Sequence, residues 1–267
     1  MTMQNAAKGN EVFETPTFGS RLKSMLKLDF YRLFHTPLFY IMLGVAALIP
    51  AMVLSLSGAE TVGPNGVTQK AIEFTNTWQM IESLGGSAVA ENPLDFGGFA
   101  NINMLFIFAG LLMAIFVAHD YNSGFVKNIF TVHSKKSDYV ISKSVIGFFS
   151  GTGMIITYVI GTIAAGLLTG KSFDVNMSGL IMCLISKVFL MGIFCSLFLG
   201  IAVFFRNKLW MTIVFTFLFG MLLYPAGSIA TLGAGIGTVF IALIAGVIGA
   251  AAFGSVSSLI LKKRDLV

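Results

Sequence analysis

The chain has 267 residues, of which 56% are hydrophobic and only 11% are charged, and its mean hydropathy is +0.86. Soluble domains carry about 25% charged residues, so this composition excludes an ordinary soluble domain and predicts an all-α membrane protein. The net charge of +5 does not indicate a nucleic-acid partner, because the basic residues stand at the ends of apolar stretches and not along one stripe.

The N-terminal region precedes the first long apolar stretch. Residues 1–17 are polar and mixed, and we expect a disordered tail there. Residues 18–36 repeat apolar side chains at helical spacing with Arg and Lys between them, which predicts an amphipathic elbow helix in the cytoplasmic headgroup region. The apolar positions are Leu22, Met25, Leu26, Phe30, Leu33 and Phe34. Pro37 suits the first turn of the next helix.

Long apolar stretches predict six transmembrane helices, since about 20 apolar residues cross a hydrocarbon core about 30 Å thick. We place the spans at residues 38–56, 99–118, 139–169, 177–205, 209–224 and 238–261 of a membrane domain at 37–267. Residues 57–98 are predicted as an extracellular loop, in which residues 69–81 could form a short helix and which could act as an external cap. Residues 119–138 are predicted as a charged cytoplasmic segment.

Lys and Arg residues set the predicted orientation. Of the 17 in the chain, all but three fall on one side; Lys70 and Lys171 fall on the other, and Lys187 falls inside the fourth span. Because cytoplasmic loops hold an excess of Lys and Arg, both termini are predicted to lie in the cytoplasm.

Lys187 is the one ionisable side chain predicted near the middle of the membrane. A charge at that depth costs about 2.5–3.5 kcal/mol, so the side chain must face a cavity, a partner or water. Two interpretations stay open. Lys187 lines a translocation path, or it snorkels outward or bonds a neighbouring carbonyl.

No pattern for a catalytic, cofactor-binding or metal-binding site is found in the sequence. The string at residues 166–172 is similar to a phosphate-binding loop, but its glycine spacing is one residue short and no strand precedes it. We therefore expect no enzyme activity and no bound cofactor in this chain, and any ATP-driven role requires a partner.

The cytoplasmic segment carries the most specific pattern. An apolar face formed by Phe125, Val126, Ile129 and Phe130 predicts a short helix at 124–131, with Lys127 and Asn128 on its other side. The segment resembles the connection between the second and third spans of ABC-2 type permeases. In that family an acidic residue and an aromatic are followed by a glycine, a basic residue and a short coupling helix. A small or basic cluster comes next, and then an aromatic and a lysine that open the third span. Those places are taken here by Asp120, Tyr121, Gly124, Lys127, Lys135, Tyr139 and Lys143.

The resemblance implies an ABC-2 (type V exporter-like) permease fold in a bacterial plasma membrane. It also implies pairing with a second copy or a paralogue, and coupling to separate ABC ATPase subunits that hold ATP and Mg²⁺. The apolar side chains of the coupling helix would sit in a groove on the ATPase. The coupling residues so implied are Asp120, Tyr121, Gly124, Phe125, Lys127, Asn128, Ile129 and Phe130. Likeness to peptide-export and immunity permeases implies an amphipathic peptide or another hydrophobic compound as substrate.

Two other classes of protein are weighed against the exporter. An ion-coupled secondary transporter would need internal repeats or carboxylates in its path, and no Asp or Glu falls within a predicted span. A membrane scaffold or assembly protein would need no coupling helix, so changes at Phe125 or Lys127 would be silent.

Overall fold

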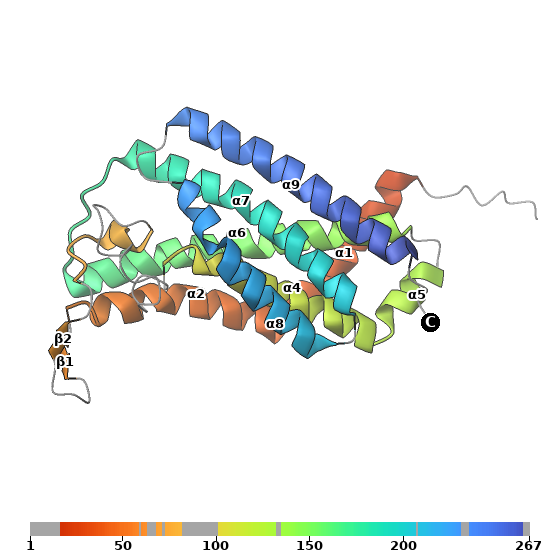
Figure 1. The fold of residues 1–267 in the computed structure, drawn as a ribbon, viewed down its shortest axis with the longest axis horizontal. Coiled ribbons are helices and arrows are strands. Elements are labelled where there is room, and N and C mark those ends of the chain that lie inside the picture. The colour runs from red at the N-terminus through yellow and green to blue at the C-terminus, as the bar shows by residue number, and fades with distance from the viewer. Residues whose placement is uncertain are drawn as a thin grey trace, which may run out of the picture.

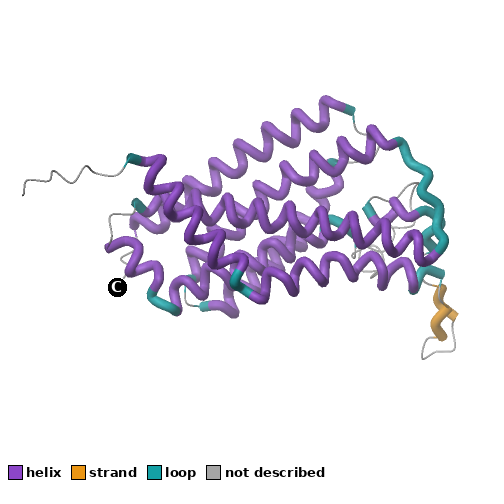
Figure 2. Tube along the Cα trace, turned by 180° about the vertical axis from the view of Figure 1, so that it is seen from behind, coloured by secondary structure: helices purple, strands orange, loops and turns teal. Residues whose placement is uncertain are grey.

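The structure is a computed structural model that describes residues 17–58, 60–62, 68–70, 73–81, 101–131, 135–206, 208–230 and 235–263. The predicted tail, apart from Thr17, and much of the predicted loop 57–98 lie outside the described residues. The long helices α2 (Pro37–Ser55), α4 (Met104–Asn122), α6 (Lys136–Thr169), α7 (Met177–Phe205), α8 (Leu209–Leu223) and α9 (Ile236–Lys263) form a bundle that extends along the longest axis of the molecule (Figure 1). Helix α1 (Phe18–Phe34) runs obliquely across the bundle at one end, as the view from behind also shows (Figure 2), and the short α5 (Phe125–Thr131) lies between α4 and α6 in the chain.

Within the described residues, five helices are long and apolar enough to cross a membrane: α2, α4, α6, α7 and α9. The fifth predicted span, 209–224, coincides with α8, which has 15 residues and is therefore about 22 Å long. A 3-10 helix, η2 (Tyr224–Ile229), continues from α8, with Pro225 in its first turn. A count of six spans thus depends on α8 together with η2, and it stays a prediction.

Three helices match the expected spans closely. Helix α7 begins and ends at the expected residues, and α2 and α9 differ from expectation by one or two. Helix α4 differs more from the second expected span, 99–118, because it begins at Met104 and continues to Asn122. Helix α6 also begins earlier, at Lys136. Most of the predicted cytoplasmic segment is therefore helical. Its two aspartates pair with cations of other segments, Asp120 with Arg32 and Lys143, and Asp138 with Arg21.

The expected all-helical chain also contains a two-stranded antiparallel hairpin of β1 (Glu60–Val62) and β2 (Thr68–Lys70). The helix that residues 69–81 could form is absent from the described part of that segment, where a 3-10 helix, η1, covers Thr77–Met80. Trp78 of η1 is buried and its Nε1 donates to the carbonyl of Phe173, 3.1 Å away. The hydroxyl of Tyr158 in α6 donates to the carbonyl of Met80 at 3.1 Å, so η1 covers one end of the bundle.

The close approach of α2 and α6 depends on Gly161. A Cβ atom at this position would overlap the backbone carbonyl of Ala47 in α2, whereas a Cβ at Gly153 of the same helix would lie 3.5 Å from Leu43 Cδ2. The first contact leaves no room for a methyl group because backbone cannot move aside as a side-chain end can. The second is an ordinary van der Waals contact.

We therefore expect Gly161→Ala to lower the free energy of unfolding by about 2 kcal/mol, the range found for overpacked cores. Gly153→Ala is the matched control and is expected to leave it unchanged or slightly raise it. Thermal unfolding of the two purified variants in detergent measures the difference. Equal melting temperatures for both variants would contradict the packing described for α2 and α6.

Candidate functional site

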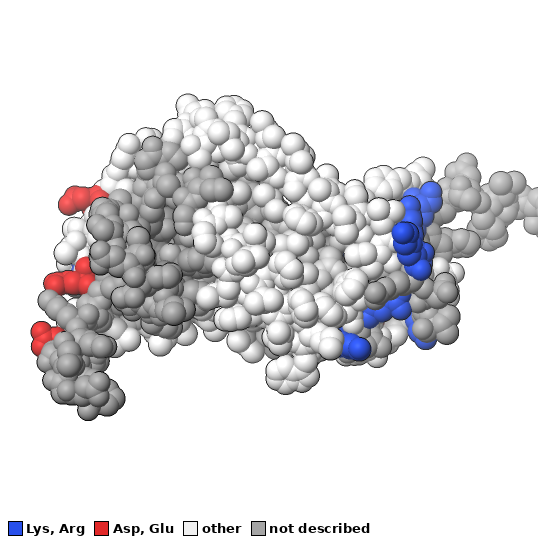
Figure 3. All heavy atoms as spheres, viewed as in Figure 1, with Lys and Arg blue, Asp and Glu red and all other residues white. Residues whose placement is uncertain are grey.

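The exposed basic residues lie at one end of the bundle. Figure 3 shows Lys and Arg at the end where α1, α5 and the C-terminal end of α9 meet, and Asp and Glu at the opposite end. Exposed lysines at this basic end are Lys23, Lys27, Lys127, Lys135, Lys208, Lys262 and Lys263. A buried cluster of charged side chains lies beneath them.

The charge cluster consists of Asp29 and Arg32 from α1, Asp120 from α4 and Lys143 from α6. The ammonium of Lys143 lies 2.7 Å from Asp29 Oδ1 and 2.6 Å from Asp120 Oδ2. Arg32 Nη2 lies 2.5 Å from Asp120 Oδ1 and Arg32 Nη1 lies 3.9 Å from Asp29 Oδ1. Two cations thus balance two carboxylates, and three helices that are distant in sequence are joined at one point.

One hydroxyl group donates to each of the two carboxylates. Ser142 donates to Asp29 Oδ2 at 2.6 Å, and Tyr139 donates to Asp120 Oδ2 at 3.0 Å. Tyr139 and Lys143 are four residues apart and share one face of α6. A separate ion pair, Arg21 Nε to Asp138 Oδ2 at 2.9 Å, joins α1 to the first turn of α6.

The burial of this cluster explains why α4 continues past the predicted boundary. Asp29, Asp120 and Lys143 are each 0% exposed, and an unpaired charge at such a site would cost several kcal/mol. Asp120 also lies in the last turn of α4, where the helix dipole disfavours an anion. The two nearby cations offset both effects, so a carboxylate is accommodated inside a helix that we expected to end at Ala118.

Helix α5 presents its apolar face to its own bundle. Val126 is buried, and the ring of Phe130 lies against that of Tyr139 with centroids 5.9 Å apart. The guanidinium of Arg32 lies 3.9 Å from the centroid of Phe125, a cation–π contact. The expectation that these apolar side chains enter a groove on a partner does not fit this arrangement, because they are already packed within the chain.

The outward face of α5 is polar. Lys127 and Asn128 are exposed, whereas Phe125, Ile129 and Phe130 are only partly so. Gly124 connects α4 to α5 with φ of +72°, a left-handed conformation that glycine adopts without a steric penalty. The turn fixes the direction of α5, so that Lys127 and Asn128 stay at the surface of the basic end.

The structure brings together several residues singled out in the sequence and adds others. Asp120, Tyr139, Lys143 and Phe125 meet at the charge cluster, where Lys143, expected at the entry to the third span, is fully buried. Sequence reasoning missed Asp29, Arg32 and Ser142 as members. One signal was available: Asp29 is flanked by Met25 and Leu33 at four-residue steps, on the apolar face of the elbow helix, where an acidic side chain requires a partner.

Lys187 lies away from this cluster. The residue is 1% exposed. Its ammonium donates to Asn103 Oδ1 at 2.8 Å and to the carbonyl of Gly227 at 3.0 Å. Cys183, one turn earlier in α7, donates to the carbonyl of Ala230 at 3.1 Å. The bonds to the carbonyls of Gly227 and Ala230 reach the connection between α8 and α9. One face of α7 therefore satisfies carbonyls that no regular helix satisfies.

A comparison with protein families bears on these helices. A model described as "ABC-2 family transporter protein" matches residues 25–223, a range that holds α5 and every member of the charge cluster. The chain belongs to the ABC-2 transporter family. No curated protein and no solved structure gave a match.

Membership of the ABC-2 family fixes the general role of the chain. Proteins of this family are membrane subunits of ABC transporters and are not themselves the ATPase, so family membership implies an ATPase partner. The apolar helices and the family together identify a multi-pass membrane protein.

Proposed function

We propose that this ABC-2 protein is the permease subunit of an ATP-driven exporter and that α5 is its contact with the separate ATPase subunits. The observation that carries the proposal is that α5 is amphipathic. Its apolar face is held by the bundle, while Lys127 and Asn128 stand free at the basic end. A partner therefore meets a polar surface, and a charge on Lys127 favours an acidic or hydrogen-bonding rim on the ATPase.

The charge cluster provides a way for movement of α5 to reach the spans. A displacement of α5 moves Phe125 against Arg32 and Phe130 against Tyr139. Arg32 is paired with Asp120, and Tyr139 bonds the same carboxylate. Separating these groups would leave buried charges unpaired, so α1, α4 and α6 are expected to move with α5 as one unit.

The remaining parts of the proposal concern assembly. The basic end faces the bacterial cytoplasm, both termini lie there, α1 serves as the elbow helix, and α8 with η2 completes a sixth span. Two copies, or this chain and a paralogue, enclose the path. The substrate is an amphipathic peptide or another hydrophobic compound, and ATPase assays in liposomes across peptides and lipids test its identity by stimulation of hydrolysis.

A double variant tests the docking surface. We expect Lys127→Glu with Asn128→Asp to reduce co-purification of the ATPase subunit in mild detergent at least about tenfold, since like charges across an interface are strongly unfavourable. Thermal stability should not change, because both side chains are exposed. Lys208→Glu is the matched control, an exposed basic residue at the same end but outside α5. Unchanged recovery of the ATPase with the double variant would refute α5 as the contact.

A further inference from the structure

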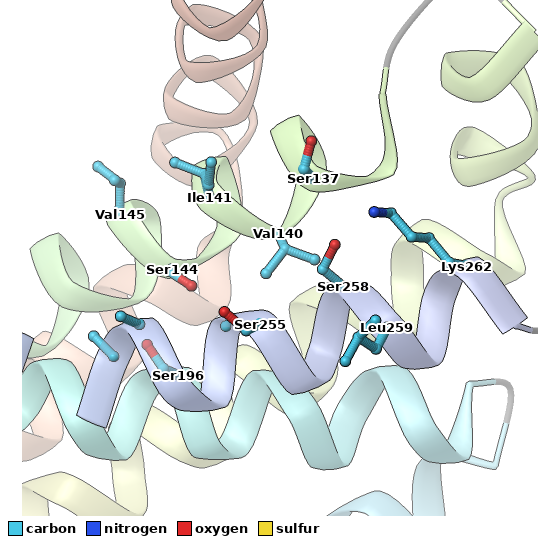
Figure 4. Close-up of a pocket in the computed structure, with 13 residues that line it drawn as sticks. Ser137, Val140, Ile141, Ser144, Val145, Ser196, Ser255, Ser258, Leu259 and Lys262 are labelled. Atoms are coloured by element: carbon cyan, nitrogen blue, oxygen red, sulfur yellow. The ribbon is translucent and has the colours of Figure 1, made fainter. Parts of the chain in front are cut away.

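A groove opens between α6 and α9 near the basic end, with α7 beneath it (Figure 4). Its volume is about 540 Å³, and a second hollow of about 340 Å³ extends along the same helices. The two hollows share Ser144, Val145, Ser196 and Ala250 in their walls. They form one elongated groove along α6 and α9.

The two hollows differ in chemistry. The larger is lined by serine hydroxyls from three helices and by Lys262, whose side chain extends toward the gap between α6 and α9 (Figure 4). The smaller contains large apolar side chains, among them Phe148, Phe189 and Leu243. Glycine and alanine positions of α9 leave the space open, since a Cβ at Gly254 would meet only Val140 Cγ1, at 4.0 Å.

The hydroxyls in the groove differ from the other serines of these helices. Ser150, Ser186 and Ser257 turn inward, and each donates to the carbonyl four residues earlier. By contrast, among the described residues no hydrogen bond is found for the side chains of Ser144, Ser196, Ser255 or Ser258. Ser196 is only 1% exposed and lines both hollows, so a ligand in the groove that accepts a hydrogen bond from it is favoured.

We propose that this groove binds a single anionic phospholipid. The phosphate of the headgroup lies near Lys262 with the serine hydroxyls donating to phosphate and ester oxygens, and an acyl chain lies in the apolar hollow. Three observations carry the assignment: a cation at one end only, hydroxyls without partners next to it, and an apolar continuation. Ile141 and Leu259 flank the groove at 38% and 54% exposure, as expected for walls that meet lipid. The site does not depend on the ATPase contact.

Native mass spectrometry of the full chain tests the site. The protein is purified in detergent containing equal amounts of phosphatidylglycerol and phosphatidylcholine with the same acyl chains. We expect the wild type to retain phosphatidylglycerol about fivefold over phosphatidylcholine, the preference that one lysine at a membrane surface provides. Lys262→Gln should remove the preference, and Gly254→Leu, which fills the groove, should remove the bound lipid.

Each of the two substitutions has a control that makes the same chemical change outside the groove. Lys263→Gln removes a neighbouring exposed lysine that does not line the groove. Gly44→Leu adds the same side chain to α2, where a Cβ meets nothing within 4 Å. Both controls should retain phosphatidylglycerol as the wild type does. Equal retention of the two lipids by the wild type, or unchanged retention by Gly254→Leu, would overturn the proposal. Conversion of a dimer to a monomer by Gly254→Leu would also overturn it, because the groove would then be a subunit interface.

Discussion

Replacing Lys143 with methionine is expected to lower the free energy of unfolding by about 4 kcal/mol, the largest effect of a single substitution in this chain. The change keeps the volume of the side chain but removes the cation between Asp29 and Asp120, both 0% exposed. Two buried carboxylates would then share Arg32 alone, and breaking one side of a buried ion pair costs about 3–5 kcal/mol. Thermal unfolding in detergent measures the loss.

A second substitution separates charge from packing. Asp29→Asn removes the carboxylate whose shortest ion pair is with Lys143 and keeps an acceptor for Ser142. Combined with Lys143→Met, it should recover most of the lost stability, because Asp120 keeps Arg32 as its partner and no unpaired charge remains. Lys27→Met, on the exposed side of α1, is the control and should be silent. Simple additivity of Asp29→Asn and Lys143→Met would argue against a coupled cluster.

Replacing Lys187 with methionine is expected to destabilise the protein by about 3 kcal/mol. The ammonium donates to Asn103 Oδ1 and to the carbonyl of Gly227, and all three residues are buried. Hydrogen bonds to charged groups contribute about 1.5–3 kcal/mol each. The carbonyl of Gly227 lies in η2, which is not a regular α-helix, so no helical N–H replaces the ammonium as its donor. The connection between α8 and α9 should therefore loosen, which hydrogen exchange at Tyr224–Ile229 would detect.

The same variant distinguishes the two interpretations of Lys187 that the sequence left open. A structural role predicts a lower melting temperature with or without substrate present. A role in lining the translocation path predicts an unchanged melting temperature and an altered rate of transport. Lys171→Met, in the turn between α6 and α7, makes the same chemical change outside the spans and should alter neither quantity.

Hydropathy predicted the helices well because membrane helices must satisfy their own backbone hydrogen bonds over a fixed thickness. Helix α7 has the expected bounds for this reason. The same reasoning failed at α4 because it treats Asp120 as the end of an apolar stretch. Its partners, Arg32 and Lys143, come from other helices, and a window of sequence holds no information on those contacts.

Helix α5 shows the corresponding limit for the candidate site. The pattern of Val126, Ile129 and Phe130 predicted a short amphipathic helix at the right place, because amphipathicity depends only on local spacing. It did not determine whether the apolar side faces a partner or the bundle, since either burial removes the same surface from water. Only the left-handed turn at Gly124 and the contacts with Tyr139 and Arg32 decide it.

The sequence by itself determined the class of protein and the approximate positions of most apolar helices, since both follow from local composition and spacing, and its resemblance to ABC-2 permeases indicated the family. The tertiary structure alone decided which charges are paired, which side of α5 is free, and what Lys187 bonds. Those outcomes depend on contacts such as Ser142 with Asp29, 113 positions apart. A buried charge is stable only when a distant segment supplies its partner, and folding brings those segments together.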